Sequence, residues 1–112
     1  MPNSNSIAAR VVLTTAADPD EASRLARTLV DERLAACATL IPSARSIYRW
    51  EGEVEEATET LILLKTGSDQ IAALKDRLHA LHSYKTPEFL VLPVESGSAG
   101  YLEWLQSGLR RI

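Results

Sequence analysis

The sequence of 112 residues predicts an α+β fold in a single domain, residues 1–112. Short apolar runs typical of strands alternate with helical patterns in the order strand, helix, strand, strand, helix, strand. The two middle strands are long and together occupy residues 34–66. A further helical pattern follows the last strand. Two split βαβ units around a hairpin define a ferredoxin-like βαββαβ sandwich, here with an extended β-hairpin and a C-terminal helix.

The first strand and helix have clear local signals. Residues 8–15 form a short apolar run typical of a buried strand. Asp18 can cap the next helix, Pro19 suits its first position, and Glu21 stands three residues after the cap, as in a capping box. One apolar face then follows at helical spacing: Ala22, Leu25, Ala26, Leu29 and Val30.

The hairpin is too long for a compact domain. Each strand has about 13 to 15 residues, which at about 3.3 Å per residue exceeds 40 Å. We expect a bend at Pro42-Ser43, a turn at Glu51-Gly52 with Gly52 at positive φ, and a tip that extends beyond its own domain.

The second half repeats the pattern. Ser68 can cap a helix whose apolar positions run from Ile71 to Leu81, and residues 89–94 read as a strand. Pro93 predicts that this strand lies at an edge or a bulge. Ser98 can cap a last helix that carries Tyr101, Leu102, Leu105 and Leu109.

The sheet should carry apolar side chains on both faces. Right-handed crossovers place both helices on one side of the sheet. Yet residues 61–64 are apolar in both phases of the strand period. We therefore expect a homo-oligomer with sheet faces turned toward each other and hairpins reaching across subunits. Ile62→Asp or Leu64→Asp is expected to dissociate or unfold it.

Composition limits the partners and the location. A hydrophobic content of 46% and a charged content of 24% are ordinary for a soluble protein, and a net charge of −3 with no basic stripe predicts no nucleic acid partner. No apolar run reaches membrane-spanning length, so no membrane partner is expected. The lone Cys37 fits a reducing compartment, which predicts a cytoplasmic location. Residues 1–6 are mostly polar, and residues 1–7 are expected to form a flexible N-terminus.

Four separated blocks resemble a known family. LAACATLIPSARSIYRWEGEVEE, ETLILLKT, HSYKTPEFLVLPV and YLEWL are similar to the divalent-cation tolerance proteins called CutA. The resemblance implies a homotrimer of ferredoxin-like subunits, not an enzyme, associated with tolerance of copper and other divalent cations. Two positions depart from the family pattern. The usual His-Pro-Tyr reads His82-Ser83-Tyr84, and Thr14 stands where some members have cysteine.

Candidate metal ligands are His82, Glu88 and Cys37. Imidazole and thiolate suit copper or zinc, whereas Glu88 alone suits harder ions. The helical stripe turns His82 inward and His79 outward, near the helix C-terminus. Two of these candidates have a structural alternative, because His82 can serve as a buried hydrogen-bonding group and Cys37 as a small hydrophobe. No recognisable ligand spacing is present.

A ligand cleft is the second candidate site. Its residues fall in the resembling blocks: Tyr48, Trp50, Lys65, Tyr84 and Trp104. A Lys65–Glu88 pair beside aromatic walls would hold a small anion or a metal complex. The alternative is that the tryptophans pack at a subunit seam and the pair only joins two strands.

Three functions remain open. The first is a trimeric cation-tolerance protein that binds copper or another divalent cation at clefts between subunits. The alternative is a trimeric small-ligand-binding signalling module that resembles nitrogen-regulatory PII proteins, although no Gly-rich phosphate loop is present. The third, an acyl-phosphate hydrolase, needs an arginine-bearing phosphate loop after the first strand, which the sequence lacks.

Overall fold

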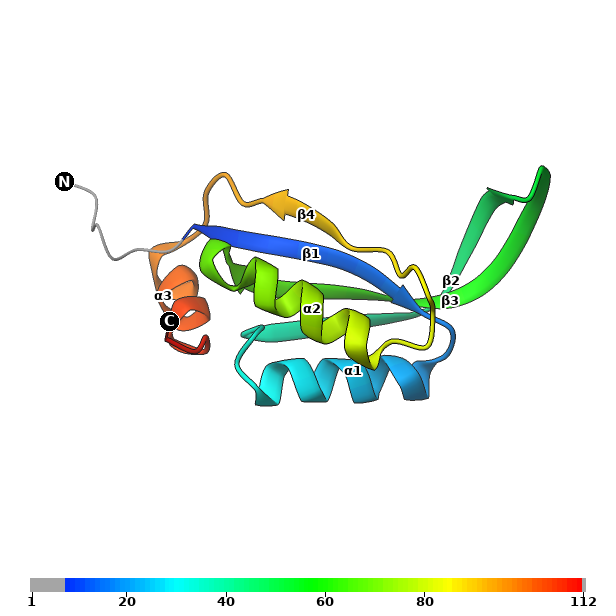
Figure 1. Ribbon diagram of the computed structural model, residues 1–112. Helices are drawn as coiled ribbons and strands as arrows, with labels where there is room; N and C mark the ends of the chain where they lie inside the picture. The colour runs from blue at the N-terminus through cyan, green and yellow to red at the C-terminus, as the bar shows by residue number, and fades with distance from the viewer. Residues whose placement is uncertain (1–7, 112) are drawn as a thin grey trace.

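The computed structural model describes residues 8–111 and confirms the α+β sandwich (Figure 1). The expectation for residues 1–7 falls outside the described residues. The elements are β1 (Ala9–Ala16), α1 (Pro19–Asp31), β2 (Cys37–Trp50), β3 (Glu53–Gly67), the 3₁₀ turn η1 (Ser68–Gln70), α2 (Ile71–Leu81), β4 (Leu90–Pro93) and α3 (Ala99–Ser107). One antiparallel sheet has the strand order β2-β3-β1-β4.

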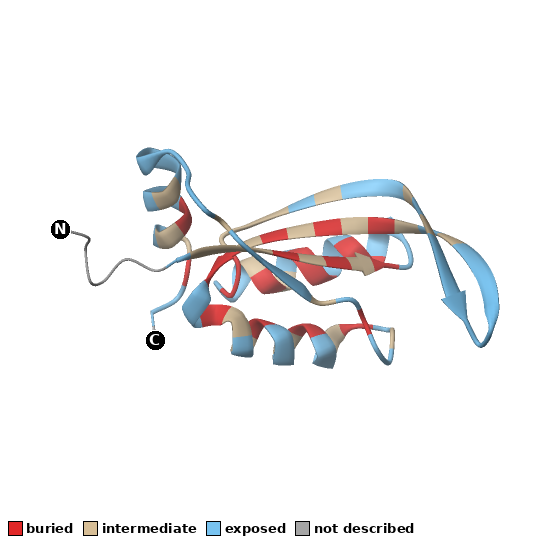
Figure 2. Cartoon of the chain, turned by 90° about the horizontal axis from the view of Figure 1, so that it is seen from above, coloured by how far each residue is buried: buried red, intermediate tan, exposed pale blue. Residues whose placement is uncertain are grey.

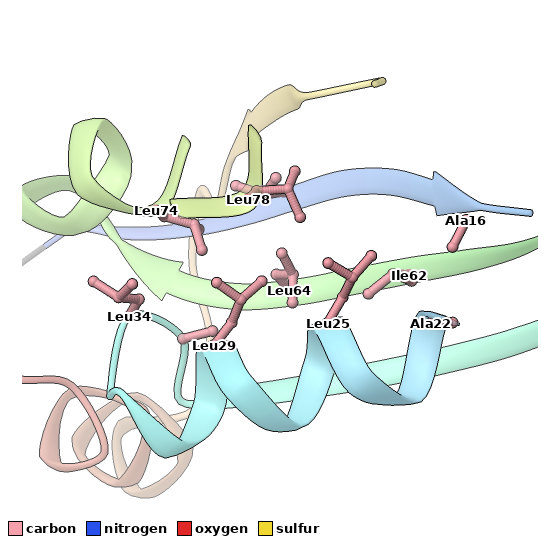
Figure 3. Packing of buried hydrophobic residues seen from close by; sticks show 11 residues of the cluster. Ala16, Ala22, Leu25, Leu29, Leu34, Ile62, Leu64, Leu74 and Leu78 are labelled. Carbon is pink, nitrogen blue, oxygen red and sulfur yellow. The ribbon is translucent and has the colours of Figure 1, made fainter. Parts of the chain in front are cut away.

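The core lies between this sheet and the pair of helices α1 and α2. The strands contribute Val12, Ile62 and Leu64, each with no exposed surface. Figure 3 shows Leu25 and Leu29 of α1 and Leu74 and Leu78 of α2 around Ile62 and Leu64, with both helices on the same face of the sheet. Full burial of each such side chain contributes about 1.5–3 kcal/mol, which makes this layer the main source of stability.

The opposite side of the sheet carries a second apolar surface. Cross-strand partners on it form three rows: Leu92–Val11–Lys65–Cys37, Leu90–Leu13–Leu63–Thr39, and Thr15–Leu61–Ile41. We call these residues the open face. Ile41, Leu90 and Leu92 on it are 44%, 54% and 44% exposed. Apolarity on both sides of the sheet, which the sequence predicts, is therefore present.

The apolar residues 61–64 of β3 divide between the two faces of the sheet. Ile62 and Leu64 point into the core under the helices, whereas their neighbours Leu61 and Leu63 lie on the open face. The prediction that Ile62→Asp or Leu64→Asp tests the assembly is therefore wrong in its reason, since both residues belong to the core of one chain. Residues of the open face are the proper test.

The hairpin bends where the sequence predicts. Strand pairing between β2 and β3 shifts register between Ile41 and Ala44, and Ser43 adopts a φ of 62°. The turn at Glu51 and Gly52 has φ values of 49° and 84°, which confirms the two-residue turn. Beyond the bend the hairpin leaves the rest of the chain and is mostly exposed (Figure 2).

Two of the expected helix starts differ in detail. Asp18 Oδ1 accepts a hydrogen bond of 2.8 Å from the Glu21 N–H, as predicted. Ser68 does not cap α2, because it begins a 3₁₀ turn that delays the α-helix until Ile71 and leaves Gln70 at the N-cap. Ser98 stands at the N-cap of α3, but its side chain makes no capping bond.

Pro93 lies on the edge strand β4, as the sequence predicts. In the described part of the chain, none of the helices has the length and apolar character needed to cross a bilayer.

Candidate functional site

Polar side chains gather where β1 ends and the hairpin leaves the sheet. They come from four segments, namely α1, β3, the end of α2 and the loop after it. We call them the hairpin-base cluster: Glu21, Glu59, His82, Ser83 and Tyr84.

His82 is held by the backbone at both ring nitrogens. Its Nε2 lies 2.7 Å from Thr15 O, and the Tyr84 N–H donates to its Nδ1 at 3.0 Å. A carbonyl oxygen only accepts, so Nε2 carries the proton and Nδ1 is the acceptor. The imidazole is thus a neutral, fully buried crosslink, and a metal ion would have to break one of these two bonds.

Glu21 joins the start of α1 to the residue after His82. Its two carboxylate oxygens accept from the Ser83 N–H and the Ser83 hydroxyl, each at 2.8 Å. Burial alone would raise the pKa of Glu21, but the two hydrogen bonds from Ser83 outweigh it and lower the pKa. A proline at position 83 has no N–H to donate, so this link depends on the serine.

Glu21→Gln tests this link through pH. A carboxyl whose pKa is lowered on folding stabilises the protein above its unfolded pKa of about 4.3, and the contribution disappears as pH falls through the folded value. We expect Glu21→Gln to lower the free energy of unfolding by about 1–3 kcal/mol at pH 7. Urea unfolding across pH should show the difference from the parent shrinking below about pH 4. The exposed Glu95→Gln is the control, and an equal loss at every pH would contradict the assignment.

Glu59 and Tyr84 form the second link of the cluster. The Tyr84 hydroxyl donates to Glu59 Oε2 at 2.7 Å. Burial first, and the bond to Glu59 second, raise the pKa of Tyr84 far above its usual range. Burial also opposes the charge on Glu59, but hydrogen bonds from Ser46, Tyr84 and Thr15 outweigh it and lower the pKa of Glu59.

The candidate metal ligands do not meet within one chain. His82 and Glu88 lie toward the end of β1 where the hairpin leaves, whereas Cys37 pairs with Lys65 near the start of β1. The ammonium of Lys65 lies 3.7 Å from Cys37 Sγ and 3.1 Å from Thr39 Oγ1. Over residues 8–111 no three His, Cys, Asp or Glu side chains form a group that could hold a metal ion.

The expected Lys65–Glu88 pair is wrong. Both β3 and β4 run antiparallel to β1, so they are parallel to each other. The end of β3 and the start of β4 therefore lie at opposite ends of the sheet, and Lys65 bonds to Cys37 and Thr39 instead.

The ligand-cleft candidates are also dispersed. Tyr48 and Trp50 lie on the projecting hairpin and are 44% and 61% exposed. Tyr84 belongs to the hairpin-base cluster. At the far end, Trp104 of α3 lines a shallow groove of about 770 Å³ together with α1 and the first residues of β2, including Cys37. Within residues 8–111, therefore, no single cleft unites these side chains.

Thr14 marks a further departure from a metal centre. It is fully buried on the helix-covered face, and its hydroxyl has no hydrogen-bond partner among the described residues. Because Thr14 supplies no thiol and both His82 nitrogens are occupied, the donors among the described residues of one chain do not fit a copper or zinc ion.

Thr14→Val should stabilise the protein. Valine has nearly the same shape and removes an unpaired buried hydroxyl, so the free energy of unfolding should rise by about 1 kcal/mol. Thr66→Val is the matched control, because the Thr66 hydroxyl is equally buried but donates to Leu34 O at 2.7 Å. That variant should lose stability in the same urea titration. A loss from Thr14→Val as large as that from Thr66→Val would refute the assignment.

Comparison with known proteins gives the family. The model of the CutA1 divalent ion tolerance protein family matches residues 10–108. A divalent-cation tolerance protein CutA of Escherichia coli is 49% identical over 107 residues, which cover 96% of each chain. The solved structure of the Thermus thermophilus divalent cation tolerance protein has a TM-score of 0.89 at 44% identity, over 91% of this chain and 99% of that one.

A second solved structure comes from a protein described as periplasmic. It is the periplasmic divalent cation tolerance protein CutA of Archaeoglobus fulgidus, with a TM-score of 0.88 at 35% identity over 91% of this chain and 99% of that one. A family model that spans nearly all of the described residues, together with relatives that match in sequence and in fold, confirms the resemblance of the four blocks. The chain belongs to the CutA family of divalent-cation tolerance proteins.

Proposed function

We propose that three copies of this chain assemble with their open faces turned toward one another, and that the homotrimer serves divalent-cation tolerance by binding rather than by catalysis. The observation that carries the proposal is the open face itself. It brings apolar side chains from all four strands onto the side of the sheet that the helices leave uncovered.

Contact with water makes the open face energetically unfavourable in a single chain. Ile41, Leu90 and Leu92 are each 44% exposed or more, and they adjoin Val11, Leu13, Leu61 and Leu63 in the cross-strand rows. Burial of apolar surface contributes about 25 cal/mol per Å², so covering this set favours association by several kcal/mol per chain. Contiguous apolar patches of this kind mark interfaces in soluble proteins.

The hairpin supports the same arrangement. It projects beyond the sheet with Ile47, Trp50 and Val54 each more than 60% exposed. A two-stranded ribbon with such side chains is marginal alone in water, so a neighbouring copy is the natural surface for it.

A divalent cation would bind between subunits. One chain separates Cys37 from Glu88 and locks both nitrogens of His82, so a ligand set requires donors from two chains. Copper is the first candidate because a thiol is among the available donors. The single thiol also supports a cytoplasmic location.

Isothermal titration with copper and with zinc under chelator control tests the binding. We expect saturable binding below millimolar concentration that weakens in Cys37→Ser and Glu88→Gln and persists in His82→Gln. Absence of saturable binding to the assembled protein would remove the cation from the proposal, without affecting the trimer. A thermal-shift screen with nucleotides tests the PII-like alternative. No feature of the described residues favours that alternative.

A further inference from the structure

We infer that Glu59 is the anchor that sets the direction in which the hairpin leaves the sheet. It acts as a positioning residue, because its carboxylate ties the base of the hairpin to two other segments, β1 and the loop after α2. The inference concerns one chain and does not require the proposed trimer or a bound cation.

The backbone alone leaves this direction weakly defined. Strand pairing between β2 and β3 is interrupted between Ile41 and Ala44, where Pro42 and Ser43 together oppose Thr60. On the other side of β3, pairing with β1 ends at Ala16 and Thr60. Beyond Thr60, ladder bonds therefore join the two hairpin strands only to each other. Two-stranded ribbons twist and bend more readily than wider sheets.

Glu59 is the first residue of β3 on the hairpin side of this interruption, opposite Ala44. Its carboxylate accepts hydrogen bonds from Tyr84 of the loop after α2, Ser46 of β2 and Thr15 of β1. A carboxylate has about four acceptor sites and no donor, so it can receive three hydroxyls together. The bonds from Tyr84 and Thr15 join the hairpin to the rest of the chain across the point where the ladder bonds are missing, whereas the bond from Ser46 joins the two hairpin strands to each other.

The anchor is attached to a rigid part of the molecule. The Tyr84 N–H donates to His82 Nδ1, and the two rings pack with centroids 4.8 Å apart. His82 is in turn bonded to Thr15 O at 2.7 Å, and Ser83 to Glu21. The phenol that holds Glu59 is therefore fixed to β1 and α1 rather than to a free loop.

The test measures the direction of the hairpin separately from stability. Spin labels are attached through Glu53→Cys near the hairpin tip and Ala80→Cys on the exposed side of α2, in a Cys37→Ser background. Labelled chain is diluted into excess unlabelled chain, so that only distances within one chain contribute. We expect Glu59→Gln to widen the distance distribution at least twofold, and Tyr84→Phe to widen it by a smaller factor.

Glu55→Gln is the matched control, because Glu55 is an exposed carboxylate four residues away on the same strand. It should leave the distribution unchanged. A lower urea midpoint in Glu59→Gln with an unchanged distribution would overturn the inference, since Glu59 would then contribute to stability alone. If Glu59→Gln fails to fold, Tyr84→Phe decides, because it removes one hydrogen bond and keeps the ring.

Discussion

Leu13→Asp is expected to convert the protein into folded monomers. Leu13 lies at the centre of the open face, between Leu63 and Leu90, and points away from the helices. In a single chain the carboxylate would face water at little cost. In the assembly it would be buried without a partner, which costs several kcal/mol per chain.

Light scattering after size-exclusion chromatography measures this outcome, and circular dichroism checks that the fold remains. Ala80→Asp, on the exposed side of α2, is the matched control and should keep the parent mass. A Leu13→Asp protein with the parent mass and the parent stability would show that the open face is not an interface.

Leu64→Asp is expected to prevent folding altogether. Leu64 has no exposed surface and lies in the core beside Leu29, Leu74 and Leu78 (Figure 3). The substitution removes a well-packed side chain and places a charge where no partner is available, so the loss should exceed about 4 kcal/mol, a large share of the stability of a small domain.

Far-ultraviolet circular dichroism and urea titration measure the loss of stability in Leu64→Asp. Leu64→Met is the volume-conserving control and should lower the free energy of unfolding by less than about 1.5 kcal/mol. A Leu64→Asp chain that still unfolds cooperatively near the parent midpoint would mean that the sheet faces are assigned the wrong way round.

Local sequence patterns predict the order of the elements and the turns, but they do not predict which face of the sheet the helices cover. The order of elements, the bend at Pro42-Ser43 and the turn at Gly52 follow from short-range chemistry, and the structure has all of them. The face assignment does not follow, because residues 61–64 are apolar in both phases and only the docked helices distinguish them. A strand in which polar and apolar residues alternate would have indicated from the sequence which of its sides faces the core.

The site was harder to predict because its links join distant parts of the chain. Glu21 and Ser83 are 62 residues apart, and Glu59 and Tyr84 are 25 apart. Glu21 also fits a capping box, an interpretation that hides its bond to Ser83. One sequence signal did point to the site. Glu59 is a carboxylate at a position whose alternating neighbours, Leu61 and Leu63, are apolar, and such a position favours a carboxylate that is held by hydrogen bonds.

His82 illustrates what residue type alone leaves undecided. The helical stripe predicts that it is buried, and it is, but His82 is the extended residue just after α2, so the chain leaving the helix sets its orientation. Whether an inward histidine is a ligand or a crosslink depends on its neighbours, here Thr15 O and the Tyr84 N–H. The expected pairing of Lys65 with Glu88 failed for a related reason, because strand direction follows from topology and not from either residue.

The mass of the untagged chain in solution tests the central claim most directly. Light scattering at micromolar concentration should give three times the chain mass of 12.3 kDa, because the open face is covered only when copies share it. A stable, folded species of a single chain mass at that concentration would contradict the account, since the apolar face would then remain in water without cost.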